Sequence, residues 1–556
     1  MTAREQWDSD ADDAGALWWR WAVIYQIYPR SFADSDSDGV GDLRGIIGKL
    51  DYLADTLGVD AIWCGPLYRS PQVDFGYDIS DHTDIDPVFG TLEDFDALIA
   101  AAHQRGLKVI VDFVPNHTSA EHPWFAESRS SRTAAKRDWY VWADSAPGGG
   151  PPSNWTSEQG GSTWEFDETT GQWYLHSFNR AQPDVNWRCP QLRKAMLGVL
   201  RFWLDRGVDG FRIDALHMIA KDPGLTDNPV RENAEPNPTD RQHPDFDSQW
   251  HVHDRMHPDL HDHIREIRAL LAEHSARTGQ ERIAIGEIEA MPWESWVSFL
   301  GDGGTHFNFN FNFVETPWEP AALRAGVEEQ EAALPAGAWP NYVLSNHDRP
   351  RLATRNGSRS VRIAAMLLLT LRGTPTLYYG DELGLADLPI PEEKWLDPLG
   401  RDQARATMPW TSRGNGGFDS GPADAAPWLP VSDEYLRLSV QSQLTEPDSV
   451  LNLYRRLLAL RRSEPALRHG AFRALDLRAE QCMGYLRSTR RQELAVLLNF
   501  GDADTTVGLP GRGRVLLSAD VPSAVAEHAL RQRFLVRGHS GLLVELDDVV
   551  PRQRDA

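Results

Sequence analysis

The stretch Gly210-Phe211-Arg212-Ile213-Asp214-Ala215 is an apolar run that carries one arginine and ends in one carboxylate. Its apolar residues predict a short buried strand. Because side chains alternate along a strand, we expect Arg212 and Asp214 to point to the same side. A guanidinium so close favours the ionised carboxylate, so we expect it to lower the pKa of Asp214. Such a pair is either a structural ion pair or an anionic group suited to act as a nucleophile, and the stretch alone favours neither.

Seven similar runs accompany this one, and amphipathic segments typical of helices lie between them. The eight runs are Val23–Tyr28, Ala61–Leu67, Val109–Val114, Gly210–Asp214, Arg282–Ile288, His306–Phe313, Tyr342–Asn346 and Thr374–Tyr379. The helical candidates include Leu92–Arg105, Gln191–Arg206 and His261–Ser275. Eight β-then-α units predict an α/β fold, a parallel (β/α)8 TIM barrel, with an open doubly wound sheet as the alternative.

Two connections between the runs are too long for ordinary loops. Residues 117–187, rich in Gly, Pro, Ser and Trp, predict a small domain inserted after strand 3, whereas the connection 221–258 is rich in Asp, Asn, Pro and His. From residue 471 onward, short alternating runs separated by turn residues predict an all-β sandwich. We therefore expect a barrel made of residues 1–116 and 188–470, an inserted domain 117–187 and a C-terminal β-sandwich 471–556.

Composition and charge restrict the classes of partner. The net charge of −25 argues against binding nucleic acid or anionic membranes, both of which need clustered basic residues. The three cysteines are widely spaced and predict neither a disulfide framework nor a zinc site. Residues 1–16 lack the apolar core of a signal peptide, and no apolar stretch is long enough to span a membrane. We expect a cytoplasmic monomer or homodimer with small-molecule substrates.

Polar side chains gather at the ends of the expected strands, where the active sites of βα barrels lie. They are Asp112, Asn116, His117, Arg212, Asp214, Glu287, Asn346, His347 and Asp348. Each could be a structural polar residue, but their shared position favours a common site. Paired carboxylates suit glycoside hydrolysis, in which one attacks the anomeric carbon and the other protonates the leaving oxygen. Asp214 fits the nucleophile, and Glu287, flanked by isoleucines, fits the proton donor.

Four stretches carry a family resemblance: Asp112-Phe-Val-Pro-Asn-His117, Gly210-Phe-Arg-Ile-Asp214, Ile285-Gly-Glu287 and Ser345-Asn-His-Asp348. In this order, on the expected strands, they resemble the α-amylase superfamily of retaining glycosidases, glycoside hydrolase family 13. The resemblance implies Asp214 as nucleophile, Glu287 as acid/base and Asp348 as transition-state stabiliser. It places Asp112, His117, Arg212 and His347 around the cleaved glucosyl unit, and it implies no catalytic cofactor.

Further stretches resemble the oligo-1,6-glucosidase and α-glucosidase branch. They are Gln182-Pro-Asp-Val-Asn186 and Gly400-Arg-Asp. The resemblance implies that Asp74 and Arg401 hold the terminal glucose in a blind pocket, with Tyr77 as a sugar platform, so that the enzyme is exo-acting. Phe178 is either a pocket wall or a packed core aromatic.

The residue after the expected nucleophile bears on linkage. Ala215 stands where α-1,6-cleaving members of the branch tend to have Val, so it favours α-1,4-linked substrates such as maltose and malto-oligosaccharides. The same site could also serve an α-glucosyltransferase or a sucrose- or trehalose-acting isomerase. An inactive scaffold relative is a remote alternative, because the catalytic set is complete.

An acidic loop near the N-terminus predicts a metal site. In Asp34-Ser-Asp36-Ser-Asp38-Gly-Val-Gly-Asp42, carboxylates alternate before a turn-forming glycine, as at the start of an EF-hand loop. We expect a structural Ca²⁺ or Mg²⁺ held by Asp34, Asp36, Asp38, the Val40 carbonyl and Asp42. A solvated acidic turn is the alternative. The histidines in and just after the 221–258 connection lack a ligand spacing for zinc and favour a solvated loop; they are His243, His251, His253, His257, His261 and His263.

Overall fold

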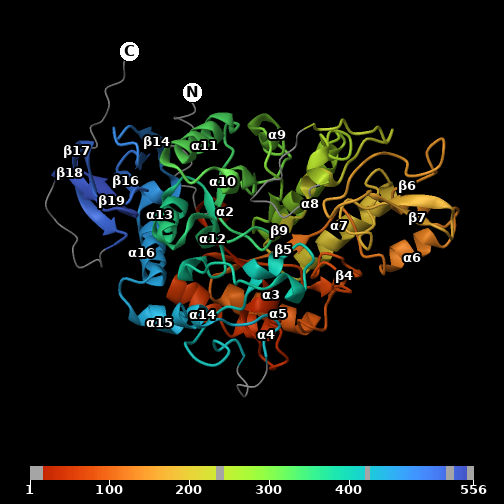
Figure 1. Cartoon of the computed structure of the whole chain (residues 1–556), viewed down its shortest axis with the longest axis horizontal. Helices are drawn as coiled ribbons and strands as arrows, with labels where there is room; N and C mark the ends of the chain where they lie inside the picture. The colour runs from red at the N-terminus through yellow and green to blue at the C-terminus, as the bar shows by residue number, and fades with distance from the viewer. Residues whose placement is uncertain (1–16, 233–242, 244, 420–425, 521–530, 548–556) are drawn as a thin grey trace, which may run out of the picture.

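The protein, described here by a computed structural model, is built around a barrel of eight parallel strands (Figure 1). The structure describes residues 17–232, 243, 245–419, 426–520 and 531–547. The barrel strands are β1 (Ile24–Ile27), β2 (Ala61–Cys64), β5 (Lys108–Phe113), β9 (Gly210–Ile213), β10 (Ile283–Gly286), β11 (Phe307–Asn308), β12 (Asn341–Val343) and β13 (Thr374–Tyr378). They pair in the order β11-β10-β9-β5-β2-β1-β13-β12. The expected α/β barrel is therefore confirmed.

Helices follow the strands and cover the outside of the barrel. They are α4 (Leu43–Ile47), α5 (Leu92–Gln104), α7 (Pro190–Asp205), α8 (Leu260–Thr278), α9 (Trp293–Val297), α10 (Phe311–Glu315), α11 (Pro320–Ala333), α12 (Leu352–Asn356), α13 (Val361–Thr370) and α16 (Val450–Ser463). Helix α5 begins at a capping box formed by Thr91 and Asp94, which satisfies backbone N–H groups at its start. The helices predicted after strands 2, 3 and 4 match α5, α7 and α8.

Alternation along the strands divides their side chains between two apolar layers. Ile24, Ile110 and Ile285 belong to one buried cluster with Trp18 and Trp19 of α2 (Trp18–Trp21), which fills the barrel interior. Their neighbours in the chain, such as Tyr25 and Val111, belong to a second cluster that packs against the helices. Further along the strands, the inward positions become polar, which places the site at the carboxyl ends.

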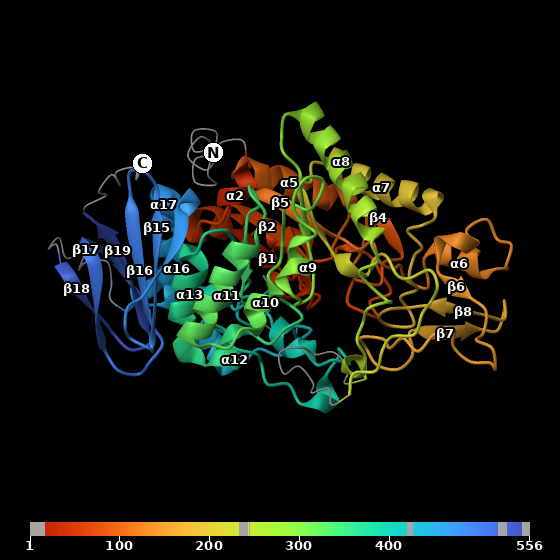
Figure 2. The ribbon, with the colours of Figure 1, turned by 90° about the horizontal axis from the view of Figure 1, so that it is seen from above.

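A small sheet lies between β5 and β9 in the chain and projects from one end of the molecule (Figures 1 and 2). Its strands β6 (Trp142–Ala143), β8 (Gln172–Leu175) and β7 (Trp164–Asp167) pair antiparallel in the order β6-β8-β7, next to α6 (Pro123–Arg129). A two-stranded ribbon, β3 (Tyr68–Arg69) with β4 (Asp81–Ile85), follows β2. These excursions bring side chains from outside the barrel to its carboxyl edge.

The C-terminal part is all-β and lies at the opposite end of the molecule from the small sheet (Figure 2). Its strands β14 (Ala471–Leu475), β15 (Cys482–Ser488), β16 (Glu493–Asn499), β17 (Thr505–Ser518), β18 (Arg531–Val536) and β19 (Ser540–Leu546) form one antiparallel sheet. The first half of β17 pairs with β18 and its second half with β19. The expected sandwich is thus made from a single sheet, because β17 bends and carries β18 over its neighbours.

One barrel strand is shorter than the sequence predicted. The run His306–Phe313 is a strand only at Phe307–Asn308, since Asn310 accepts a hydrogen bond from the Phe313 N–H and starts helix α10. Residues 1–16, which were expected to carry no signal peptide, lie outside the described residues. Within the described ranges, the structure has no helix with the length and apolar character needed to cross a membrane.

Candidate active site

Arg212 is the centre of the polar cluster at the carboxyl edge of the barrel. Strand register places it directly beside Asp112 of β5, and its Nη1 donates to Asp112 Oδ1 at 2.9 Å and to Asp214 Oδ1 at 2.5 Å. Its Nη2 donates to Glu287. The guanidinium also lies over the Trp63 ring, 5.2 Å from its centroid. One buried cation therefore holds three carboxyl groups together.

The backbone between β9 and the following turn positions the two catalytic candidates. Ala215, directly after Asp214, has a φ of 42°, in the left-handed region that is uncommon for residues other than glycine. This conformation directs the Ala215 N–H to Glu287 Oε2, at 3.0 Å. The same turn that ends the strand thus links the carboxyl expected to attack with the one expected to donate a proton.

The pKa of Asp214 differs from the sequence expectation. Burial raises it well above the usual value, and the nearby charges of Glu287 and Asp112 raise it further, against the lowering effect of Arg212. The pKa of Asp112 is raised to about 7, also mainly by burial. The expectation of a lowered pKa was wrong because burial outweighs the effect of Arg212, and Glu287 and Asp112 add to the effect of burial.

Asp348 and His347 lie on the side of the cluster formed by β12 and β13. Asp348 Oδ1 accepts from Arg401 at 3.2 Å and from Arg405 at 3.1 Å. Although burial opposes ionisation, these cations and His347 hold the pKa of Asp348 well below its usual range. The Tyr77 ring stacks on His347, with centroids 5.4 Å apart, and its hydroxyl lies 2.7 Å from His347 Nε2. Burial lowers the pKa of His347 to about 3, so the imidazole is neutral near pH 7.

An ion pair between distant parts of the chain lies beside this group. Arg401 Nη2 contacts Asp74 Oδ1 at 2.5 Å, and Asp397 holds the same guanidinium at 2.7 Å. Gln182 Nε2 donates to Asp74 Oδ2 at 3.0 Å and lies 3.1 Å from His117 Nε2. Asp74, Gln182 and Arg401 come from three separate connections, so the pocket wall exists only in the folded chain.

A cavity of about 130 Å³ brings most of the sequence-predicted site residues together. Its lining includes Asp74, Tyr77, His117, Phe178, Arg212, Asp214, Ala215, Glu287, Asp348 and Arg401. Asp112 and His347 do not line it but contact residues that do, Arg212 and Tyr77. Phe178 meets the His117 ring edge-on at 5.1 Å.

The cavity also includes residues that sequence reasoning missed, among them Glu158, His217, Glu289 and Arg349. His217 and Glu289 could have been found from their positions, because each follows a predicted catalytic residue by two or three places. Glu158 carries no local signal, since it lies in the long excursion between β5 and β9.

The acidic loop before α4 brings three carboxylates together. Oxygens of Asp34, Asp36 and Asp42 all lie within 4.8 Å of one another, and hard oxygen donors of this kind fit Ca²⁺ or Mg²⁺. Asp38 lies outside this group and accepts from the Val40 N–H at 2.7 Å. Gly39, with a φ of 93°, allows the tight turn, and a Cβ there would meet the Ala426 carbonyl oxygen at 2.5 Å.

Residues 26–470 match the family model of the alpha-amylase catalytic domain. The chain belongs to the α-amylase family of glycoside hydrolases, family 13. It is 42% identical over 518 residues to a Rhizobium meliloti protein named "Probable alpha-glucosidase", covering 89% of this chain and 91% of that one. It is 35% identical over 543 residues to an oligo-1,6-glucosidase of Parageobacillus thermoglucosidasius, covering 89% and 92%. These relatives place it in the α-glucosidase branch.

The fold comparison agrees with the family assignment. The crystal structure of an α-glucosyl transfer enzyme superimposes with a TM-score of 0.88 at 38% identity, covering 95% of this chain and 99% of that one. The family 13 chain described here is therefore a glycoside hydrolase whose relatives include enzymes named for hydrolysis and for transfer.

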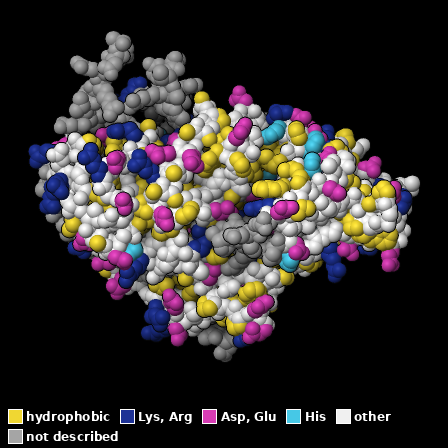
Figure 3. All heavy atoms as spheres, turned by 45° about the horizontal axis from the view of Figure 1, so that its top comes forward, with side chains coloured by type: hydrophobic (Ala, Val, Ile, Leu, Met, Phe, Trp, Pro, Cys, Tyr) yellow, Lys and Arg dark blue, Asp and Glu magenta, His cyan; other side chains and the backbone are white. Residues whose placement is uncertain are grey.

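On the face shown in Figure 3, acidic side chains are interspersed with basic ones.

Proposed function

We propose that the protein is an exo-acting, retaining α-glucosidase that releases α-glucose from the non-reducing end of short α-glucosides. The observation that carries the proposal is the placement of Asp214 and Glu287 on one guanidinium, in a cavity that the Asp74–Arg401 ion pair also lines. Retaining glycosidases need carboxyl groups only about 5–5.5 Å apart. A shared arginine supports so short a separation.

In the proposed reaction, Asp214 attacks the anomeric carbon while Glu287 protonates the glycosidic oxygen, so the bond to the leaving group breaks as the bond to Asp214 forms. Glu287 then takes a proton from water, which attacks the covalent β-glucosyl-enzyme and releases α-glucose. The Arg212 guanidinium contacts both Asp214 and Glu287, so it holds the proposed nucleophile and the proposed acid/base in one arrangement. Arg401 and Arg405 keep Asp348 ionised, so that it can stabilise positive charge on the sugar ring.

The Asp74–Arg401 ion pair in the cavity lining supports exo action, because such a barrier would stop a longer chain from continuing past the glucosyl unit. Ala215 in the same lining favours α-1,4 linkages, such as that of maltose, over α-1,6 linkages. The likeness to an α-glucosyl transfer enzyme favours transfer to sugars or alcohols as a second candidate activity of the same site.

Anomeric NMR of the products formed from maltose, isomaltose, sucrose and trehalose tests the proposal. We expect α-glucose to appear first from maltose, with little from isomaltose. New glucosides in place of free glucose would assign the transferase activity instead. Asp214→Asn should lower kcat/KM on maltose by about 10⁴-fold or more with an unchanged circular dichroism spectrum. Full activity in this folded variant would refute Asp214 as nucleophile.

We also infer that the loop of Asp34, Asp36 and Asp42 holds a structural Ca²⁺ or Mg²⁺ ion. Its support is the convergence of three carboxylates on one point and the hydrogen bond from the Gly45 N–H to Asp42 Oδ1, 2.8 Å, which anchors the loop to α4. The reaction above needs no step at the metal, so the ion would serve stability.

A further inference from the structure

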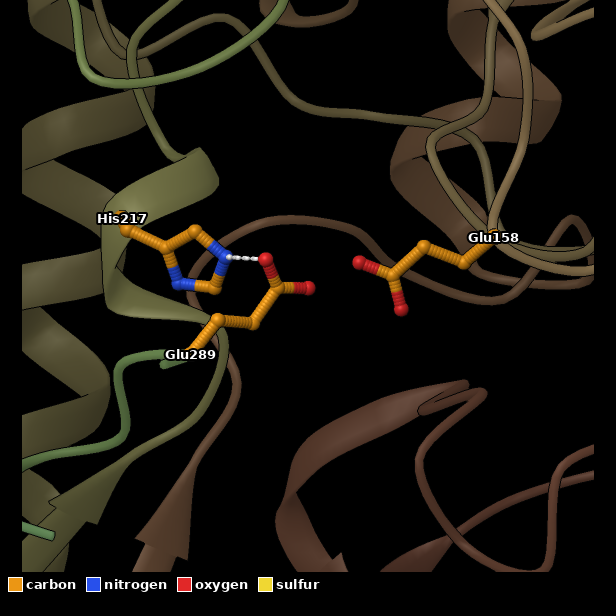
Figure 4. A group of neighbouring side chains, drawn as sticks. All are labelled: Glu158, His217 and Glu289. Carbon is orange, nitrogen blue, oxygen red and sulfur yellow. Dashed lines mark ion pairs between the residues drawn. The ribbon is translucent and has the colours of Figure 1, made fainter. Parts of the chain in front are cut away.

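A second acidic group lies in the wall of the same cavity. Glu158, His217 and Glu289 come from three separate segments, and their side chains point toward one another (Figure 4). The Glu289 carboxylate lies 3.6 Å from His217 Nε2. Glu289 follows the proposed acid/base Glu287 by two residues, so it lies on the same strand end. The family 13 reaction described above does not use this group.

A buried arginine lies against the two glutamates. Arg255 Nη1 donates to Glu289 Oε2 at 2.5 Å, while its Nη2 lies 4.0 Å from Glu158. The Arg255 side chain is 7% exposed, against 25% for Glu289 and 14% for Glu158. The carboxylates therefore offer more surface to the cavity than the cation does. Arg255 also lies over the Phe246 ring, 4.8 Å from its centroid, which fixes it in the 221–258 connection.

Arg255 is the buried cation of this group. The Arg255 guanidinium is shared among Glu289, Glu158 and Asp254, whose Oδ1 lies 3.7 Å from Nε. Asp254 in turn contacts His251 Nδ1 at 2.5 Å. A divalent cation on the two glutamates would lie against the Arg255 guanidinium, which opposes a metal site here. The two carboxyl groups that line this part of the cavity instead suit a ligand that supplies hydrogen-bond donors.

Resting on the proposed α-glucosidase function, we propose that Glu158 and Glu289 form the leaving-group side of the pocket. They select leaving groups and acceptors that present hydroxyl or ammonium groups, and they reject anionic ones, such as phosphorylated or carboxylated sugars. Hydroxyl and ammonium groups donate hydrogen bonds to carboxylates, whereas a phosphate or carboxylate offers no donor and adds repulsion. His217 packs beside Glu289 and restricts its position.

Three α-1,4-glucosides that differ at one terminal group test this selection. Maltitol, 1-amino-1-deoxymaltitol and maltobionate carry the same glucosyl unit on open-chain leaving groups that end in a hydroxyl, an ammonium and a carboxylate. We expect kcat/KM to fall in the order ammonium, hydroxyl, carboxylate, with about a tenfold or larger ratio between the extremes at low salt. High salt should reduce this ratio because it screens the charges.

Two variants assign the effect to the named residues. Glu289→Gln and Glu158→Gln should each lower the ratio of kcat/KM for the ammonium substrate to kcat/KM for the carboxylate substrate several-fold. This ratio does not depend on the fraction of enzyme that is active, because both constants are measured on the same preparation. Glu328→Gln, on the outer surface of helix α11, serves as the matched control and should leave the ratio unchanged. If Glu289→Gln fails to fold, Glu158→Gln, on a different segment, still carries the test.

The outcomes separate this inference from the function on which it rests. Absence of turnover with maltose and the three glucosides would refute the proposed α-glucosidase. Turnover with equal constants for the three, or a preference for maltobionate, would overturn the inference alone. A charge preference that survives in both glutamine variants would also overturn it, because the selection would then come from other residues.

Discussion

At the scale of single residues, Arg212 shows how one buried cation organises a site. Its guanidinium reaches Asp112, Asp214 and Glu287, and the strand register of β5 and β9 makes the first of these contacts unavoidable. Burial raises the pKa of Asp214 and of Asp112, against the lowering effect of Arg212, so one positive charge does not offset the cost of burying both carboxylates.

The raised pKa of Asp112 gives a testable pH dependence. Its value in the folded protein is about 7, against about 3.9 for an unperturbed aspartate. Between these values the folded state binds more protons than the unfolded state, so the free energy of unfolding falls as pH rises from about 4 to about 7. Below this window the carboxyl is neutral in both states, and the penalty is absent.

Asp112→Asn should remove this penalty, which is worth up to about 4 kcal/mol at about 1.4 kcal/mol per pKa unit. Urea unfolding at pH 5 and pH 8 measures it: the loss of stability between the two values should be smaller in the variant than in the wild type. Wild-type and variant curves with the same pH dependence would contradict the assignment. The same variant should lose kcat/KM on maltose, because Arg212 loses an anionic partner.

At the scale of elements, the acidic loop before α4 combines a turn, a helix start and a cluster of carboxylates. Asp34 accepts backbone N–H groups of Asp36, Ser37 and Gly39, and its own N–H donates to the Phe418 carbonyl at 2.9 Å. The loop thus joins the start of the chain to a segment near residue 418. An ion bound there would strengthen a contact between distant parts of the barrel.

Removal of the proposed ion should lower stability without altering the chemistry. A ligand present at 100 times its Kd stabilises the folded state by about 2.7 kcal/mol, so EDTA should lower the unfolding midpoint measurably, and added Ca²⁺ or Mg²⁺ should restore it. Asp36→Asn should reduce the change in the unfolding midpoint that EDTA causes and the change that added Ca²⁺ or Mg²⁺ causes. A midpoint that EDTA leaves unchanged in the wild type would exclude the structural ion, whatever the activity.

The elements also show which features a sequence can predict. All eight barrel strands were located, because each is an apolar run of strand length and amphipathic helical segments lie between them in the chain. The run His306–Phe313 was extended too far, since its aromatic alternation continues into α10 and only Asn310, acting as a cap, ends the strand. The single bent sheet of the C-terminal part depends on the pairing of β17 with two partners, which no local pattern encodes.

The residues of the candidate site also include some that the sequence predicts and some that it does not. Motif residues such as Asp214 and Glu287 could be named from the sequence because strand ends converge in a barrel. Glu158 and Arg255 could not, since long connections bring them to the cavity and their neighbours are set by tertiary packing. The predicted direction of the Asp214 pKa shift was wrong for a related reason: the shift depends first on burial by the folded chain and then on charges from neighbouring strands.

At the scale of the whole molecule, the C-terminal sheet is joined to the barrel by a continuous apolar layer. Leu494, Val496 and Leu498 of β16 belong to the same buried cluster as the helices, while Ala495 and Leu497 face the other side. Tyr485 of β15 is fully buried at this junction, and its hydroxyl lies 2.5 Å from Thr370 Oγ1 of α13. Sheet and barrel should therefore unfold together.

Tyr485→Ala tests this coupling. Loss of a large buried aromatic side chain costs about 3–5 kcal/mol, and we expect the urea transitions followed by tryptophan fluorescence and by activity to shift by the same amount. Leu509→Ala, in the separate cluster inside the sheet, should also shift both transitions together if sheet and barrel unfold as one unit. An activity transition unaffected by Tyr485→Ala would show that the barrel holds its structure independently of the sheet.

The Asp74–Arg401 ion pair has a consequence for the order of events in a catalytic cycle. If it closes the far end of the cavity, the glucosyl unit enters first and the product glucose leaves last, through the opening by which the leaving group has already departed. Free glucose should then compete directly with substrate for the empty enzyme. Arg401→Ala, which removes this ion pair, would open a second exit from the cavity. Glucose should then dissociate faster from the enzyme.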